Sequence, residues 1–158
     1  MPDFAHLWLL LKEFFSNGSH QAREYPWRGK VPWTKEFKYS IKSKTVRQSI
    51  HPELRKLFEE VLHYRDHALV SGYRSETEQA EMVLLGRSQL PWPFSKHNKI
   101  PSRAVDVAPY PVPGDEDPEW DYFALFVKAL AVDMDIVVKW GGDWTSFVDK
   151  WHWEHEDF

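Results

Sequence analysis

Residues 95–106 carry the clearest signal of fold and chemistry in the chain: Ser95-Lys96-His97-Asn98-Lys99-Ile100-Pro101-Ser102-Arg103-Ala104-Val105-Asp106. His97 supplies an imidazole, and nine residues later Asp106 supplies a carboxylate inside an apolar run that predicts a buried strand. A buried carboxylate is costly unless a metal, a cation or several donors compensate its charge. Near the end of the chain, His152 offers a second imidazole. Together His97, Asp106 and His152 would form the two-imidazole, one-carboxylate set of many catalytic zinc sites, with one position left open.

The composition is that of a single folded domain. The chain has 158 residues, 42% hydrophobic and 16% aromatic, which argues against disorder and allows a buried core. Its formal net charge is −4, so no basic field predicts a nucleic-acid partner. It has no cysteine, which excludes disulfides, thiolate metal sites and a cysteine nucleophile. We therefore expect one domain over residues 1–158.

A membrane span needs about 18 consecutive apolar residues, and no apolar run in the chain comes close to this length. Residues 4–15 lack the basic leader and the small-residue cleavage site of a signal peptide. We therefore expect no membrane insertion and a product that stays in the cytoplasm of the cell that makes it. Most of the nine tryptophans are expected in the core, although such an excess also suits the walls of a cleft for sugar or peptide.

Apolar periodicity predicts an α+β fold, with most helices early and the strands clustered late. Helices are expected over residues 4–15, 52–62, 76–85 and 120–132, and strands over residues 68–70, 104–108, 136–140 and 151–154. Residues 19–49 are broken by proline and glycine and predict an irregular segment, either a loop-rich insertion or a wall that faces the substrate. A loop is expected over residues 90–101, and a short helical turn over residues 146–150.

Asp149 precedes His152 by three residues, close enough to take a proton from an attacking water and pass it to a leaving amine. The plainer alternative is that Asp149 caps a short turn. Asp106 can likewise pair with Arg103 or Lys99 instead of a metal, and a single histidine is more often a satisfied polar residue than a ligand. The residues alone leave these alternatives open.

Arg74 lies between a predicted strand end and a predicted helix start. A guanidinium at this place could hold a substrate carboxylate with two parallel hydrogen bonds. The alternative is a salt bridge to Glu76 or Glu78, and from the residues alone this alternative is the better supported.

Three motifs occur in the order found in a known family. They are Ser71-Gly72-Tyr73-Arg74-Ser75 with Gln79, then Ser95-Lys96-His97 with Ala104-Val105-Asp106, then Asp149-Lys150-Trp151-His152-Trp153-Glu154. In this order they resemble the LAS zinc peptidases, which include D-alanyl-D-alanine carboxypeptidases, dipeptidases and L-alanyl-D-glutamate endopeptidases. With the run Trp140-Gly141-Gly142-Asp143-Trp144, the chain is most similar to the single-domain phage endolysins. The resemblance covers about residues 45–155, and residues 1–44 are weakly covered.

The resemblance implies a small antiparallel sheet that carries the metal site and is flanked by helices, as in the LAS and hedgehog-like peptidase fold. It also implies roles for individual residues: zinc ligands His97, Asp106 and His152, general base Asp149, substrate-carboxylate clamp Arg74, and Ser95 as a hydrogen-bond donor at the edge of the site. The interval from His97 to Asp106 is longer than in the carboxypeptidase and dipeptidase members of the family, and the base is Asp instead of Glu. His155 and Glu154 are alternatives for the roles of His152 and Asp149, with Glu154 favoured as a supporting carboxylate.

The resulting hypothesis is a zinc-dependent peptidoglycan peptidase, an endolysin that hydrolyses the L-alanyl-D-glutamate bond of the stem peptide. It would act as a monomer, accumulate in the host cytoplasm and reach the cell wall after membrane permeabilisation, causing host lysis. One alternative is a D-alanyl-D-alanine carboxypeptidase on the same fold. Another is a catalytically silent, zinc-containing protein that binds the cell wall.

Overall fold

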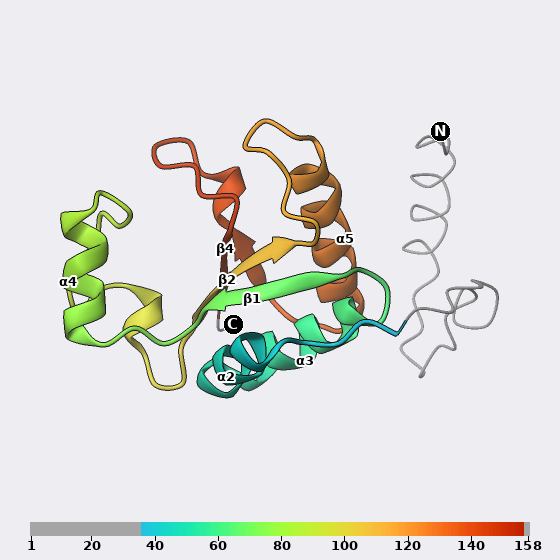
Figure 1. Cartoon of the computed structure of the whole chain (residues 1–158), viewed down its shortest axis with the longest axis horizontal. Coiled ribbons are helices and arrows are strands. Elements are labelled where there is room, and N and C mark those ends of the chain that lie inside the picture. The colour runs from blue at the N-terminus through green and yellow to red at the C-terminus, as the bar shows by residue number, and fades with distance from the viewer. Residues whose placement is uncertain (1–35, 157–158) are drawn as a thin grey trace. The chain divides into compact units, whose positions relative to one another are not determined.

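The computed structural model describes residues 36–156, and Figure 1 shows their sheet and helices. In this part of the chain, four strands form one antiparallel sheet in the order β1-β2-β4-β3. The strands are β1 (His67–Ser71), β2 (Ala104–Pro109), β3 (Val138–Trp140) and β4 (His152–His155). The helices are α2 (Ile41–Ser49), α3 (Pro52–Leu62), α4 (Glu76–Leu84) and α5 (Glu119–Asp133), with the 3₁₀ turns η1 (Lys96–Asn98) and η2 (Gly141–Asp143). The predicted α+β class is confirmed.

The central strand β2 places Asp106 between its two neighbouring strands. In the register, Asp106 lies opposite Ser71 on β1 and His152 on β4, and Val105 lies opposite Trp153. Side chains alternate between the two faces of a sheet along each strand. Asp106 and His152 therefore share one face, which is polar, and Val105 and Trp153 share the other face.

The core lies on the apolar face and is formed by α3 and α5 against the sheet. Its buried members come from both helices and all four strands: Leu54, Leu57, Phe58, Val61, Leu69, Val105, Val107, Trp120, Phe123, Ala124, Val127, Leu130, Ala131, Trp140 and Trp153. The ring of Phe58 on α3 meets the ring of Trp153 edge-on, at 5.8 Å between centroids. This packing fixes the position of the sheet and therefore of the side chains on its polar face.

Helix α4 lies at the opposite end of the sheet from α5 (Figure 1) and is held by polar contacts. Its buried residue is Gln79, whose Nε2 donates to the carbonyl oxygen of Leu90 at 2.6 Å. Nδ2 of Asn98 in η1 donates to Oε1 of Gln79 at 3.4 Å. These bonds tie α4 to the loop that carries η1.

Helix α2 corrects the expectation that residues 19–49 lack regular structure. Ser40 caps this helix, because its Oγ accepts from the backbone N–H of Ser43 at 3.1 Å. On the buried side, Oγ of Ser43 lies 3.2 Å from both the backbone nitrogen and the carbonyl oxygen of Leu69 in β1. Within α2, Ser43 is buried and Val46 is partly buried against the core, whereas Ile41 is exposed, so the helix has no apolar stripe from which periodicity could predict it.

The other predicted elements within residues 50–156 lie close to their expected bounds. α3 begins at Pro52 after its N-cap His51, and α4 ends before Gly86, whose φ of +68° suits a residue without a Cβ. Two expectations are wrong: residues 146–150 form no helical turn, and the strand expected over residues 136–140 begins only at Val138.

The helix predicted over residues 4–15 lies outside the described residues, and the single domain over residues 1–158 stays a prediction. Among the helices that the structure describes, none is long and apolar enough to cross a membrane.

Candidate metal centre

The three predicted ligands meet on the polar face of the sheet. His97 comes from η1, Asp106 from β2 and His152 from β4. Nε2 of His97, Oδ1 of Asp106 and Nδ1 of His152 form a triangle with sides of 3.2, 3.3 and 3.3 Å, and all three residues are buried. Tetrahedral ligands about 2.0–2.1 Å from a zinc-sized ion are about 3.3–3.4 Å apart. The group could therefore bind a metal ion without moving.

The outer nitrogen of each imidazole is bonded in a way that leaves the inner nitrogen as an acceptor. Nδ1 of His97 lies 2.6 Å from the carbonyl oxygen of Gly72, and Nε2 of His152 lies 3.1 Å from Oε1 of Glu154. A carbonyl and an ionised carboxylate only accept hydrogen bonds, so each outer nitrogen carries the proton and donates it. In the neutral rings, two nitrogen lone pairs then converge on the carboxylate of Asp106. Such a group needs a cation or a proton at its centre, and the residues present thus fit a metal.

The charges around the group favour a cation as well. Burial alone would raise the pKa of Asp106, but the two imidazoles and the Arg74 guanidinium hold that pKa well below its ordinary value. Burial alone would lower the pKa of His152, but Asp106 and Glu154 outweigh burial and raise it to about 9. Burial alone would raise the pKa of Glu154, which its cationic partners instead lower to about 2. Both carboxylates are therefore ionised at neutral pH, and they attract positive charge.

Arg74 lies beside the group, where its described ion-pair partner is Asp106 and not Glu76 or Glu78. Its Nη2 contacts Oδ2 of Asp106, and its Nε donates to Oγ of Ser71 at 3.0 Å. Glu78 belongs to the N-terminal capping box of α4 instead. The side chain of Arg74 is 14% exposed, so this cation stands at the edge of the metal-binding group and not on the open surface.

Ser95 lies under the turn that carries His97. Its Oγ accepts from the backbone N–H of His97 at 3.2 Å, and its own N–H donates to Oδ1 of Asn98 at 3.2 Å. Ser95 is buried and caps η1, which fixes the backbone of the metal-ligand candidate. The substrate contact predicted for Ser95 stays a prediction.

Asp149 lies in the loop before β4 and close to the group. Its N–H donates to the carbonyl oxygen of Gly141 at 3.0 Å, and its Oδ1 accepts from the N–H of Trp151 at 3.1 Å. Asp149 thus caps a turn, as the plainer alternative held. Burial first, and then the charge of Asp106, raises the pKa of its carboxyl group. Its carbonyl oxygen also accepts from the N–H of His152 at 3.2 Å, so the loop sets the position of that histidine.

Strand alternation separates His152 from its neighbours on β4. Glu154, two residues on, lies on the same face and contacts His152, whereas His155 lies on the other face and contacts Glu53. His155 therefore does not take the role of His152. Glu154 supports His152 from outside, and Nζ of Lys96 in turn lies 3.1 Å from Oε2 of Glu154.

Three features near the group were not assigned from the sequence. The carbonyl of Gly72 orients His97, and a backbone group leaves no side-chain signal. Lys96 belongs to the Ser95-Lys96-His97 motif, but its place in the sequence does not predict that it pairs with Glu154. Trp144 ends the run Trp140-Gly141-Gly142-Asp143-Trp144, and its ring lies 5.0 Å from the ring of His152, at 47° between planes. Its half-buried side chain lies as an aromatic wall beside the candidate ligand.

Comparison with known proteins agrees with this geometry. The family model described as phage L-alanyl-D-glutamate peptidase matches residues 35–156. Among solved structures, the L-Ala D-Glu endopeptidase ChiX of Serratia marcescens is similar, with a TM-score of 0.65 and 29% sequence identity over 77% of this chain and 92% of that chain. A comparison with curated proteins finds no match. The predicted fold and the predicted peptidase class are confirmed, and the L-alanyl-D-glutamate bond is favoured over the D-alanyl-D-alanine alternative. Because the family model spans most of its length, the chain belongs to the phage L-alanyl-D-glutamate peptidase family.

Proposed function

We propose that this peptidase is zinc-dependent and that His97, Asp106 and His152 hold the ion while the L-alanyl-D-glutamate bond of the peptidoglycan stem peptide is hydrolysed. The observation that carries the proposal is the convergence of Nε2, Oδ1 and Nδ1 within 3.3 Å of one another, with both outer nitrogens bonded to acceptors. Two imidazoles and one carboxylate leave a fourth position open, as catalytic zinc requires.

A zinc ion at such a site supplies Lewis-acid polarisation of the scissile carbonyl and lowers the pKa of water. The residues of the chain would manage the protons. Asp149 would accept the proton of the attacking water and deliver it to the leaving amine, a role that suits a carboxyl group whose pKa is raised by burial and by the charge of Asp106. The backbone bonds of Asp149 to Gly141 and His152 would hold the carboxylate in reach.

Arg74 would hold a carboxylate of the stem peptide. A guanidinium has five N–H donors, and the contacts with Ser71 and Asp106 engage two of its nitrogens. The planar fork therefore can both neutralise Asp106 and bind a second carboxylate. Such a contact would select peptides with an acidic residue next to the cleaved bond, as D-glutamate is.

Asp149→Asn tests the assignment of the base. The variant should retain zinc at the level of the unmodified protein and lose hydrolysis of a defined muropeptide by roughly 10²–10⁴-fold in kcat. Asp143→Asn is the matched control, because Asp143 lies in the neighbouring η2 turn and pairs with Lys128 at 2.6 Å. Unchanged turnover in Asp149→Asn would exclude Asp149 as the base.

Removal of the metal tests the larger claim. Chelation should abolish release of the peptide product, and zinc should restore it. Purified protein that hydrolyses the substrate fully after chelation, with no metal detected by mass spectrometry, would contradict the proposal.

We also infer a monomeric enzyme that reaches the wall after the host membrane is permeabilised. The monomer is supported because one chain supplies the three metal-ligand candidates as well as Asp149 and Arg74. The location is supported by membership of a phage peptidase family. Light scattering at working concentration and lysis of intact against permeabilised cells test the two statements.

A further inference from the structure

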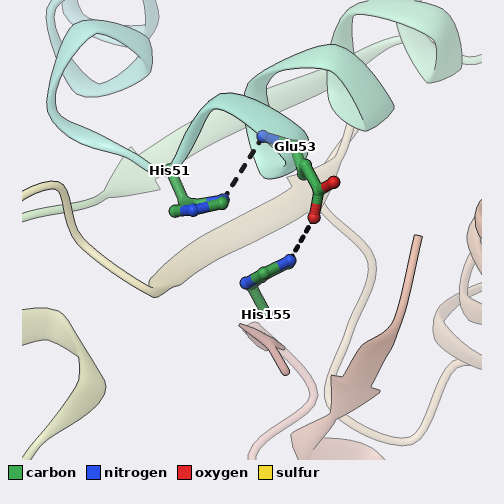
Figure 2. A group of neighbouring side chains, drawn as sticks. All are labelled: His51, Glu53 and His155. Carbon is green, nitrogen blue, oxygen red and sulfur yellow. Dashed lines mark hydrogen bonds and ion pairs between the residues drawn. The ribbon is translucent and has the colours of Figure 1, made fainter. Parts of the chain in front are cut away.

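A second group of candidate metal ligands lies outside the centre described above. His51, Glu53 and His155 each offer one ligand atom, and these atoms lie within 4.8 Å of one another. Figure 2 shows the two imidazoles one above the other with the carboxylate beside them. His51 and Glu53 stand at the start of α3, whereas His155 ends β4, about a hundred residues later. Three metal-binding side chains have thus been brought together from opposite ends of the described fold.

The main chain holds the two histidines in place. The N–H of His51 donates to the carbonyl oxygen of Ser102 at 2.8 Å, and the N–H of His155 donates to the carbonyl oxygen of Arg103 at 2.8 Å. The backbones of the two histidines are therefore anchored to two consecutive residues, Ser102 and Arg103. Their rings stack at 4.2 Å between centroids, with 17° between planes. Glu53 completes the group through a contact between its Oε2 and Nε2 of His155.

The group is separate from the first metal centre. His155 and His152 lie on the same short strand but on opposite faces of the sheet, and His155 faces α3 while His152 faces Asp106. An ion bound between His155 and Glu53 would therefore share no ligand with the first centre.

We propose that His51, Glu53 and His155 form a second site for a divalent ion of the zinc class. Two imidazoles and one carboxylate are the ligands that zinc and its neighbours prefer, in contrast to the all-oxygen sites of calcium and magnesium. Oε2 of Glu53 and Nε2 of His155 are in direct contact, so an ion between them must replace this contact and the carboxylate must move to make room. Glu53 has this freedom because its side chain is 48% exposed, while His155, at 4%, supplies the fixed partner. The second ion should accordingly bind more weakly than the first.

An ion at this site would link the end of β4 to the start of α3. The carbonyl oxygen of His155 also accepts from Nζ of Lys96 at 3.4 Å, and Lys96 contacts Glu154, the partner of His152. The second ion would therefore steady the end of β4 and, through Lys96, the support of the first centre. Its role is structural, because none of its ligands contacts the first group.

Zinc titration of the metal-free full-length protein tests the proposal, with the ions counted by calorimetry and by mass spectrometry after dialysis. Wild type should bind two ions per chain, and His51→Asn and Glu53→Gln should each bind one. Asn is a good N-cap, so His51→Asn keeps the start of α3 while removing the imidazole. His63→Asn, at the exposed C-cap of the same helix, is the matched control and should still bind two ions. The melting temperature should rise in a second step with the weaker ion in wild type and in His63→Asn, and should not do so in His51→Asn or Glu53→Gln.

Two ions in both His51→Asn and Glu53→Gln, or one ion in wild type that His97→Ala removes, would overturn the second site and leave the first intact. His97→Ala should retain one ion, which His51→Asn added to it should remove. A single ion in wild type that survives His97→Ala and is lost in Glu53→Gln would support the second site while contradicting the first. The two proposals therefore fail separately.

Discussion

Replacing Glu154 by glutamine should weaken zinc binding while leaving the fold intact. Oε1 of Glu154 lies 3.1 Å from Nε2 of His152, and Oε2 lies 3.1 Å from Nζ of Lys96. The glutamine keeps the size of the side chain and an oxygen that can accept from Nε2. It removes the negative charge that strengthens His152 as a ligand. The side chain of Glu154 is 17% exposed, so solvent screens this charge only in part.

The expected magnitude follows from the contact. Loss of a partner behind a metal-bound imidazole lowers metal affinity by about 10–100-fold, which corresponds to about 1.4–2.7 kcal/mol. A hydrogen bond to a charged group contributes about 1.5–3 kcal/mol, in the same range. Because Glu154→Gln keeps an acceptor, we expect about a 10-fold loss, and Glu154→Ala should approach about 100-fold.

The assay is competition for zinc between the metal-free protein and a colorimetric chelator, with hydrolysis of a stem peptide followed in parallel. Glu156→Gln is the matched control. Glu156 contacts the same Lys96, and also Lys139, but its described partners do not include His152. Its zinc affinity should stay within about twofold of wild type. Equal zinc affinity in Glu154→Gln and wild type would refute the reasoning, and an equal loss in both variants would trace the effect to Lys96 or to net charge.

Two further perturbations address the loop before β4 and the core. Gly141→Ala should lower activity by up to about 100-fold with zinc still bound, because the new Cβ would lie 2.5 Å from the carbonyl oxygen of Asp149. Gly114→Ala, where a Cβ meets open space, is its control, and equal activity in the two would contradict the role of the loop. Burial lowers the pKa of His67 from 6.5 to about 4. As the pH drops from 6.5 to 4, the imidazole of His67 is therefore protonated in the unfolded chain but not in the folded one, and the free energy of unfolding decreases. The loss of unfolding free energy, measured by urea unfolding of the metal-free protein, should reach about 3 kcal/mol and should be smaller in His67→Gln. The same pH dependence in both proteins would contradict this prediction.

Much of the first centre could be predicted because its signals are local. A carboxylate in the apolar run 104–108 required compensation, and the acid-x-x-His spacing at residues 149–152 pointed to a base just before the last strand and a ligand on that strand. The structure brings His97, Asp106 and His152 together as that interpretation required. The roles of Arg74, Ser95 and Asp149 stay predictions that the contacts around them support.

The rest depended on contacts that residue spacing does not encode. The helix α2 is docked by the hydroxyl of Ser43, which no hydrophobic pattern records. The pairing of Arg74 with Asp106 depends on the register of β1 against β2, which sequence reasoning did not specify. The group around His155 joins segments about a hundred residues apart, and only the folded sheet places them together.

The last strand shows how packing fixes chemistry in this fold. β4 has four residues and is paired on both sides, with Trp153 opposite Val105 on β2 and opposite Trp140 on β3. Trp153 is fully buried, so a slip of one residue would expose its ring and turn His152 into the core. The register is therefore held by the apolar residue, and His152 is directed to Asp106 as a consequence. The position of a metal-ligand candidate in this family member thus depends on a tryptophan that contacts no metal, and core stability and the geometry of the site cannot be varied independently along this strand.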